Sequence, residues 1–377
     1  MTFQPMRHNP RLVDVRAALA LVVLVTVSSA ASAQSPAADR RWEVEIDVGG
    51  AMPHSSTGGT GALPPPGPAL PINFAGVTTR AVSSWVIGDG AALLNQALSS
   101  FRVTQQIAPL DAVAQSVFAT RQSGAAVGFR VSRALNDRFA AELSVDYRRT
   151  ELALTRASLA GAEATRASFV SAWNSLLALP LLASSRSAMS TATITDHQGG
   201  QLGIGGTMVV NFAKGPTRPY VTVGAGVVTH TGGLPSAELT GRYQFQITSL
   251  APVPVAGLVF DQADTTVVRV ASHTGAVGII GGGIKRFVTP RWGIRVDVRE
   301  HIGRNRAETL VDATPRSAGT ATPGFGMLTI GTTPPLVFSV NGAGSNLSGA
   351  PISGFRTFSA SGWSGQLALT AGLIYRF

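Results

Sequence analysis

The feature that most constrains this chain is a series of segments in which apolar side chains alternate with polar or small ones. In the first of them, every second side chain is apolar, and Glu43, Glu45 and Asp47 lie between. A period of two residues is that of a β-strand with one apolar and one polar face. Eight segments of this kind are expected to form strands: Trp42 to Val48, Gly124 to Arg133, Phe139 to Arg149, Gly200 to Phe212, Pro219 to Thr231, Thr274 to Val288, Arg291 to Ile302 and Ser361 to Phe377.

The connections between these eight segments alternate strictly in length. Short connections, such as Asn136-Asp137 and Thr289-Pro290, follow the second, fourth and sixth segments, and long ones follow the others. Transmembrane β-barrels have short turns at one end, long loops at the other and an even strand number. The sequence therefore predicts an all-β fold, an eight-stranded antiparallel transmembrane β-barrel with long extracellular loops. A secreted sandwich is the alternative, although it gives no reason for the strict alternation.

The long loops contain further patterns. Residues Ala91 to Leu98 and Arg156 to Leu179 are expected to be short helices, whose apolar side chains should pack against the barrel. Three loop segments also have the composition of strands: Arg242 to Thr248, Thr266 to Ala271 and Leu336 to Val340. We interpret these as extensions above the membrane, because they sit inside loops, and a count of ten strands remains the alternative.

The N-terminal residues predict export. Arg7, Arg11 and Arg16 precede the apolar run 17–25, and Ala31-Ser32-Ala33 then supplies a small-x-small cleavage site. Residues 1–33 are therefore expected to be a signal peptide, and residues 34–377 the outer-membrane β-barrel domain. The apolar run is shorter than the roughly twenty residues that a spanning helix needs. A membrane-embedded mature chain would then have to form a closed barrel, because an open sheet leaves backbone groups unpaired in lipid.

Composition narrows the classes of function. The chain has no cysteine, which excludes a disulfide scaffold, a thiol enzyme and a zinc–thiolate site. Its formal charge of +10 comes almost wholly from arginine, since Lys214 and Lys285 are the only lysines. There is no basic run interleaved with aromatic residues, so we expect no nucleic-acid partner. Basic loops that face anionic lipopolysaccharide explain the positive charge better than a nucleic-acid partner does.

The polar faces of the predicted strands carry a nearly balanced set of charges. Six acids and five arginines are expected to point into the barrel: Glu43, Glu45, Asp47, Glu142, Asp146, Asp297, Arg130, Arg148, Arg295, Arg299 and Arg376. An eight-stranded barrel is just wide enough to be filled by its own side chains. Because the arginine guanidinium pairs bidentately with carboxylates, these residues predict a cross-linked network that plugs the lumen.

The final strand resembles the C-terminal strand of bacterial outer-membrane β-barrels. Its outward face would be Leu367, Leu369, Leu373, Tyr375 and Phe377, and the chain stops at that last aromatic residue. The resemblance implies that Tyr375 and Phe377 form the signal for the barrel assembly machinery, and that outer-membrane lipid and lipopolysaccharide are the surroundings. The architecture as a whole resembles the small OmpA/OmpX-type barrels over nearly all of the mature chain.

Motifs of catalysis are almost absent. There is no Gly-x-Ser-x-Gly elbow between a strand and a helix, and no Gly-Lys-Ser/Thr phosphate loop. Four histidines are expected at the outer ends of strands four to seven: His197, His230, His273 and His301. Converging imidazoles can bind a metal or act as bases, but half-polar rim residues are the simpler interpretation.

We therefore predict a structural, surface-interaction or adhesion-like protein without cofactor, metal or enzymatic activity. An outer-membrane enzyme acting on lipid or peptide at the rim histidines is one alternative. A narrow solute channel is the other.

Overall fold

The computed structural model describes residues 42–54, 58–67, 69–71, 78–178, 185–250, 253–271, 273–304, 307–318, 338–340, 343–347 and 349–377. The expected signal peptide, residues 1–33, lies outside these ranges. So does the start of the predicted segment Leu336 to Val340.

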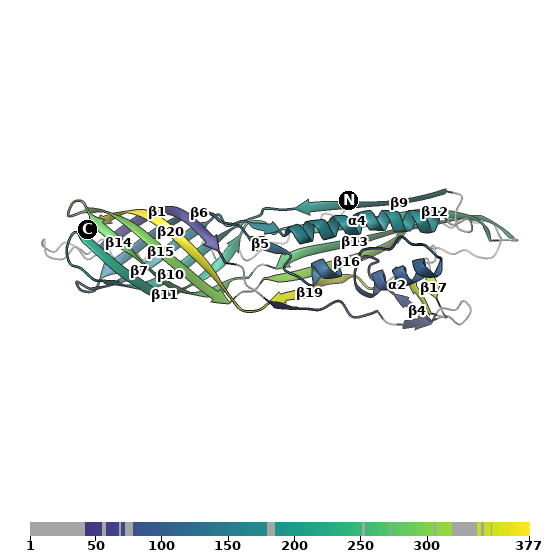
Figure 1. Cartoon of the computed structure of the whole chain (residues 1–377), viewed down its shortest axis with the longest axis horizontal. Coiled ribbons are helices and arrows are strands. Elements are labelled where there is room, and N and C mark those ends of the chain that lie inside the picture. The colour runs from purple at the N-terminus through teal and green to yellow at the C-terminus, as the bar shows by residue number, and fades with distance from the viewer. Residues whose placement is uncertain are drawn as a thin grey trace, which may run out of the picture.

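Eight strands form a closed antiparallel barrel in the order β1-β20-β15-β14-β11-β10-β7-β6 (Figure 1). Their bounds are β1 Trp42–Pro53, β6 Gly124–Ala134, β7 Phe139–Arg148, β10 Gly200–Asn211, β11 Thr217–Thr231, β14 Gly275–Phe287, β15 Trp292–Arg304 and β20 Trp363–Arg376. The first strand pairs with the last, from Glu43 opposite Arg376 to Pro53 opposite Gln366, and with β6 on its other side. The predicted eight-stranded antiparallel barrel is confirmed.

The outer face of the barrel is apolar. Exposed fractions reach 64% at Ile46 and 52% at Leu373, and they alternate with buried polar positions along each strand. In β20 the exception to the sequence pattern, Ile374, is fully buried. A continuous apolar surface of this kind suits hydrocarbon rather than water.

Aromatic side chains border this apolar face at both ends of the barrel. At the end with the short turns, five aromatic side chains are exposed or partly exposed: Phe139, Phe212, Trp292, Tyr375 and Phe377. Trp292 and Tyr375 are in contact, with ring centroids 4.9 Å apart. At the other end Tyr147 and Trp363 are exposed. Such belts mark the two membrane interfaces of transmembrane barrels.

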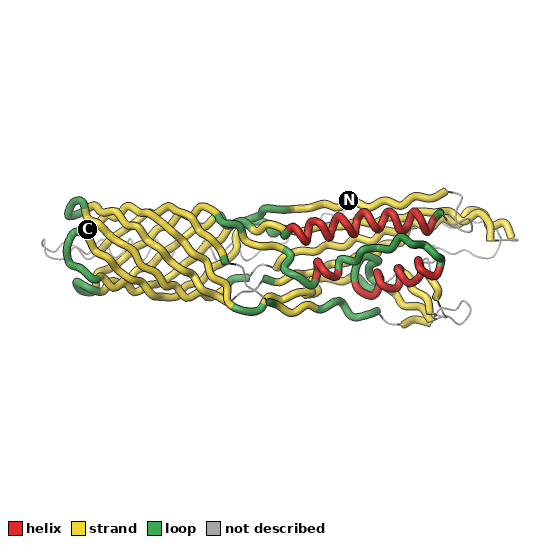
Figure 2. Tube along the Cα trace, in the orientation of Figure 1, coloured by secondary structure: helices red, strands yellow, loops and turns green. Residues whose placement is uncertain are grey.

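The long loops form a second sheet that continues the long axis of the barrel (Figure 2). Its order is β2-β19-β16-β13-β12-β9, and its bounds are β2 Gly59–Gly61, β9 Ser185–Thr195, β12 Ser236–Leu250, β13 Val253–Ala271, β16 Glu308–Ala318 and β19 Ile352–Ala360. Arg242 to Thr248 and Thr266 to Ala271 are therefore not barrel strands, in agreement with their assignment to the loops. They lie in β12 and β13, which pair with each other in this separate sheet.

Six shorter strands lie in the connections, four in one sheet and two in a pair. A four-stranded sheet has the order β17-β18-β4-β3, and β5 pairs with β8. The bounds are β3 Ala69–Pro71, β4 Thr78–Ala81, β5 Ala119–Arg121, β8 Leu152–Leu154, β17 Phe338–Val340 and β18 Ala343–Asn346. The β5–β8 pair lies where the barrel meets the second sheet (Figure 1).

Three helices belong to the described parts of the loops: α2 Gly88–Ser100, α3 Asp111–Ala114 and α4 Arg156–Leu177. Thr155 caps α4, since its side chain accepts a hydrogen bond from the backbone N–H of Ser158 at 3.1 Å. None of the described helices combines the length and apolarity that crossing a membrane requires.

The helices pack against the second sheet, so the expectation that they cover the barrel was wrong. The Trp173 ring of α4 stacks on Tyr243 of β12, with centroids 3.5 Å apart. Phe169 lies over Gly241, where a Cβ atom would meet the ring at 2.5 Å. One core joins these residues with Trp85, Leu94 and other side chains of the segment around α2. We call the second sheet with its helices the extramembrane domain.

A buried acid ties the segment before α2 to this sheet. Asp264 of β13 is 1% exposed and accepts hydrogen bonds from the Trp85 backbone N–H at 2.5 Å and the Ser84 hydroxyl at 2.9 Å. Trp85 Nε1 donates to the Tyr243 hydroxyl at 3.0 Å, which in turn donates to Gln262. Burial raises the pKa of Asp264 to about 6, because no cation accompanies it into the core.

Asp264 should give the extramembrane domain a pH dependence of stability. Folding raises the pKa of this carboxyl from 3.8 to about 6, so the folded state binds the proton more tightly. The free energy of unfolding that this group contributes should then fall by about 1 kcal/mol as the pH rises from 5 to 7. Amide-exchange protection of β12 and β13 at pH 5 and pH 7 measures this change in the free energy of unfolding. Asp264→Asn should remove this part of the pH response. An identical response in both proteins would show that the carboxyl titrates normally.

Candidate functional site

The interior of the barrel contains all eleven predicted lumen charges, and Arg295 lies at their centre. Its Nη1 atom is 2.6 Å from a Glu142 carboxylate oxygen and 2.9 Å from a Glu45 oxygen, and Nη2 is 3.5 Å from Asp297. Its Nε–H donates to the Tyr220 hydroxyl at 2.5 Å, and that hydroxyl donates to Asp297. The Arg295 guanidinium also lies 4.5 Å from the centroid of the Tyr220 ring. With 1% exposure, Arg295 is closed off from bulk water.

Two further arginines cross-link the same carboxylates. Arg299 lies 2.5 Å from both Glu142 and Asp297. Arg130 contacts three acids, namely Asp297 at 3.0 Å, Asp47 at 3.2 Å and Glu45 at 3.3 Å. Each carboxylate except Asp47 is thus shared by at least two arginines, which makes the arrangement a network rather than a set of pairs.

The network continues to both ends of the lumen. At the turn end Glu43 lies 2.6 Å from Arg376 and 2.8 Å from Lys285. At the outer end Arg148 lies 3.7 Å from Asp146 and donates to the Gln366 side-chain oxygen at 2.8 Å. The predicted charges therefore fill the barrel along its length.

Lys285, Tyr220 and Gln366 are among the members of the network that the sequence prediction missed. Lys285 raises the number of bases to six, which equals the number of acids. Its position was readable from the alternation in β14, since Ile284 and Arg286 on either side are exposed and Lys285 is 3% exposed. Tyr220 is likewise buried next to exposed Val221. With Lys285 included, the described lumen carries no net charge.

The predicted assembly residues lie at the turn end of the barrel on its outer face. Phe377 is 43% exposed, and its ring centroid is 6.3 Å from that of Tyr375. The backbone N–H of Phe377 donates to the Trp42 carbonyl at 3.0 Å, which ties the end of β20 to the start of β1.

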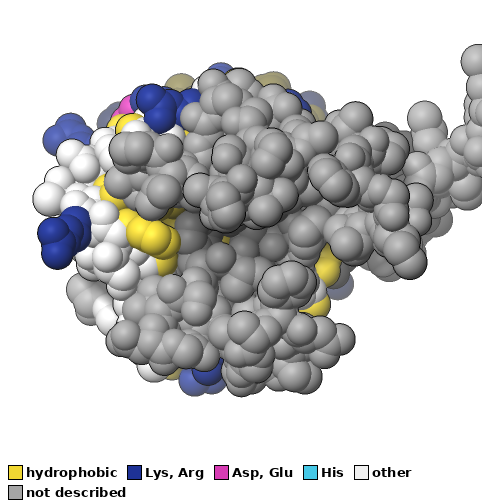
Figure 3. Space-filling view, turned by 90° about the vertical axis from the view of Figure 1, so that its right-hand side faces the viewer, with side chains coloured by type: hydrophobic (Ala, Val, Ile, Leu, Met, Phe, Trp, Pro, Cys, Tyr) yellow, Lys and Arg dark blue, Asp and Glu magenta, His cyan; other side chains and the backbone are white. Residues whose placement is uncertain are grey.

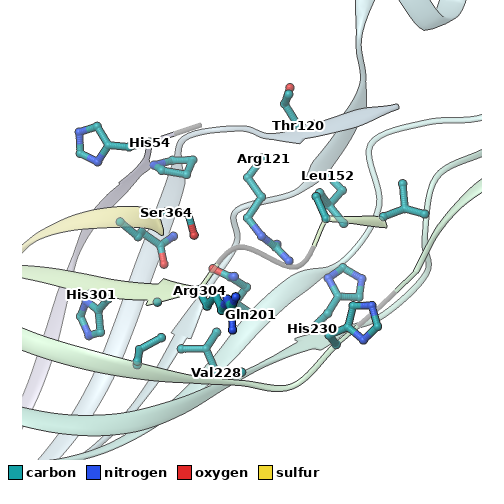
Figure 4. Close-up of a pocket in the computed structure, with 18 of the residues that line it drawn as sticks. His54, Thr120, Arg121, Leu152, Gln201, Val228, His230, His301, Arg304 and Ser364 are labelled. Atoms are coloured by element: carbon teal, nitrogen blue, oxygen red, sulfur yellow. The ribbon is translucent and has the colours of Figure 1, made fainter. Parts of the chain in front are cut away.

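The predicted rim histidines do not converge as a set of four. His197 lies outside the barrel in the connection before β10, where it is exposed and pairs with Asp196 at 3.1 Å. His230, His273 and His301 line a cavity at the outer mouth together with His54 (Figure 4). No group of three histidines or acids within the described residues has an arrangement that could hold a metal ion.

The Nε2 atom of each of the three mouth histidines has a different partner, whereas Nδ1 of His230 and Nδ1 of His301 have no hydrogen-bond partner. His301 Nε2 lies 2.6 Å from an Arg148 nitrogen, and His273 Nε2 lies 3.0 Å from Glu308. His230 Nε2 lies 2.8 Å from the Gly233 carbonyl oxygen. The Nε2 atoms of the three imidazoles are thus bound to three separate groups.

Comparison with known proteins yields no relative. No protein-family model matches the chain, and no curated protein matches it. Among solved structures it has low similarity to the CymD monoaromatic hydrocarbon channel, with 11% identity over 89% of this chain and 88% of that chain and a TM-score of 0.17. It has similarly low similarity to a Pseudomonas aeruginosa FadL homologue, with 8% identity over 89% of this chain and 90% of that chain and a TM-score of 0.16. The P. putida toluene transporter TodX is 10% identical over 91% of each chain, with a TM-score of 0.16. Superpositions this poor carry no argument, so the function has to be inferred from the chain's own structure.

Proposed function

We propose that this protein is an outer-membrane β-barrel whose plugged lumen serves only as an anchor, and whose extramembrane domain interacts with material at the cell surface. The observation that carries the proposal is the charge network around Arg295, in which arginines share buried carboxylates across the lumen. A barrel whose lumen is occupied by ion-paired side chains has no path for a solute. Its exposed functional surface is then the domain above it.

The shape of the molecule supports this division of roles. Short turns, the final strand end and the assembly residues Tyr375 and Phe377 lie at one end, which we assign to the periplasm. The extramembrane domain extends from the opposite end and has its own core. Small OmpA/OmpX-type barrels have the same strand number and an interior filled by side chains, which supports placing this chain with them.

The partner we propose for the domain is anionic surface material, such as lipopolysaccharide. In the view onto the distal end of the molecule, lysine or arginine side chains stand out around the edge of the described surface (Figure 3). Exposed arginines of this domain include Arg186, Arg242 and Arg316. We propose no enzymatic activity and no cofactor, since the mouth histidines are held by separate partners.

Surface accessibility tests the orientation. An epitope inserted at Pro66, in an exposed stretch of the first long loop, or near Gly344 should be labelled by antibody on intact cells. One inserted at Asn136 or Lys214, in the short turns, should be labelled only after permeabilisation. An epitope near Ala183, in the second long loop, should be accessible as well, although this position lies outside the described residues. Labelling at Asn136 on intact cells would reverse the proposed orientation.

A further inference from the structure

A cavity of about 210 Å³ lies where the outer mouth of the barrel meets the extramembrane domain. Its walls come from the ends of six barrel strands, β1, β10, β11, β14, β15 and β20, and from β5, β8 and β13 (Figure 4). Part of the wall is apolar and consists of Val117, Leu152, Val228, Leu234, Val270 and Val277. At roughly 30 Å³ per water molecule, the cavity has room for about seven waters or one small organic molecule.

The charged groups that line this cavity all have one sign. Arg121 and Arg304 line it, together with the mouth histidines, and none of its described lining residues is acidic. Two acids outside the lining pair with histidines of the cavity wall. Glu308 lies 3.0 Å from His273, and Glu300 lies 3.6 Å from His54. The cavity is therefore an electropositive space next to a lumen that is itself neutral.

Arg121 differs from the arginines of the lumen because no carboxylate pairs with it. Among the described residues its one hydrogen-bond acceptor is the Thr150 carbonyl oxygen, at 3.0 Å from Nη1. Burial lowers the pKa of Arg121 to about 10, and no acid opposes that effect. The guanidinium still carries its charge at neutral pH, so a desolvated cation faces the cavity without compensation.

A buried amide supplies a second unsatisfied group. Gln366 of β20 is 7% exposed, and its side-chain oxygen is occupied by Arg148. Its Nε2 atom, which carries two donors, has no hydrogen-bond partner. A buried donor without an acceptor is costly, and such exceptions call for a ligand or a water that the protein itself does not provide.

We propose that this cavity binds a small organic anion, a carboxylate with a compact apolar body. Arg121 supplies the charge that the carboxylate neutralises, and the Gln366 amide is available as a further donor. The valines and leucines of the wall receive the apolar part, which a purely inorganic anion lacks. The site is independent of the proposed surface role and does not need a conducting lumen.

The test uses the full chain folded in detergent micelles and isothermal titration with three probes. Benzoate should bind saturably, whereas benzamide, its neutral analogue, and inorganic phosphate, which has no apolar body, should each bind about tenfold more weakly or not at all. Arg121→Gln should weaken benzoate binding about tenfold or more. The matched control is Arg166→Gln, since Arg166 lies on α4 and pairs with Glu163 away from the cavity, and it should bind benzoate like the wild type.

A second variant tests the cavity in case Arg121→Gln does not fold. Val228→Phe fills the cavity from its apolar wall and should also abolish benzoate binding, while heat-modifiable migration on a gel reports a folded barrel. Absence of saturable benzoate binding to the wild type would overturn the proposal. Equal affinities for benzoate and benzamide, or unchanged affinity in folded Arg121→Gln, would overturn it as well. Phosphate binding as tight as benzoate would refute an organic ligand.

Discussion

Arg295→Ala should destabilise the barrel by about 3–5 kcal/mol, the cost of leaving buried charges without their partner. The substitution removes the cation shared by Glu45, Glu142 and Asp297, all of which remain in the lumen. It also removes the stacking partner of the Tyr220 ring. The midpoint of a urea titration, read from the heat-modifiable gel band in detergent micelles, measures the loss.

Two further variants separate the network from general effects of losing a charge. Lys214→Ala breaks a 2.7 Å ion pair with Asp137 in a turn where both side chains are exposed, and it should not shift the midpoint measurably. Arg295→Ala combined with Glu142→Gln should cost less than the two single changes together, because they belong to one network. Equal effects of Arg295→Ala and Lys214→Ala would mean that the lumen charges are not buried.

Leu369→Arg should destabilise the barrel by about 2–4 kcal/mol, because it places a charge on the lipid-facing surface near the membrane midplane. Leu369 is 47% exposed, lies halfway along β20, and pairs with Gly50 on one side and Val298 on the other. Refolding yield into lipid vesicles and the urea midpoint both measure the effect.

Val288→Arg is the matched control for the outer face. Val288 is 73% exposed and lies in the turn after β14, at the membrane interface. A new arginine there should cost only about 0–1 kcal/mol. If the two arginines were equally harmful, or equally harmless, the apolar outer face would not be in contact with a hydrocarbon layer.

The barrel strands could be predicted from the sequence because each has an apolar outer and a polar inner face. That contrast gives a clear alternation, as in Trp42 to Val48, and the bounds of β7 and β10 differ from those predicted by only one residue. The lumen charges followed from the same alternation. Lys285 follows the same rule, since its position in the alternation of β14 is as regular as that of the arginines.

The extramembrane domain was predicted only in part: parts of β12 and β13 were recognised as strands, but other strands of this domain lack that contrast. β9 is made of Ser, Thr, Ala and single larger residues, and Pro315 interrupts the pattern of β16. The helix α4 was readable from its composition, but the partner of its apolar face depends on which sheet lies nearby in space. The cavity at Arg121 also depends on tertiary structure, because its lining comes from strands far apart in the chain.

Planar-bilayer recording tests the plugged lumen most directly. The network joins Arg295, Arg299 and Arg130 to buried acids across the width of the barrel, so the purified wild-type protein should show no steady conductance. Arg295→Ala should lower stability more than it raises permeability. Large, well-resolved openings from the folded wild-type protein would contradict a plugged lumen and would indicate a transport role.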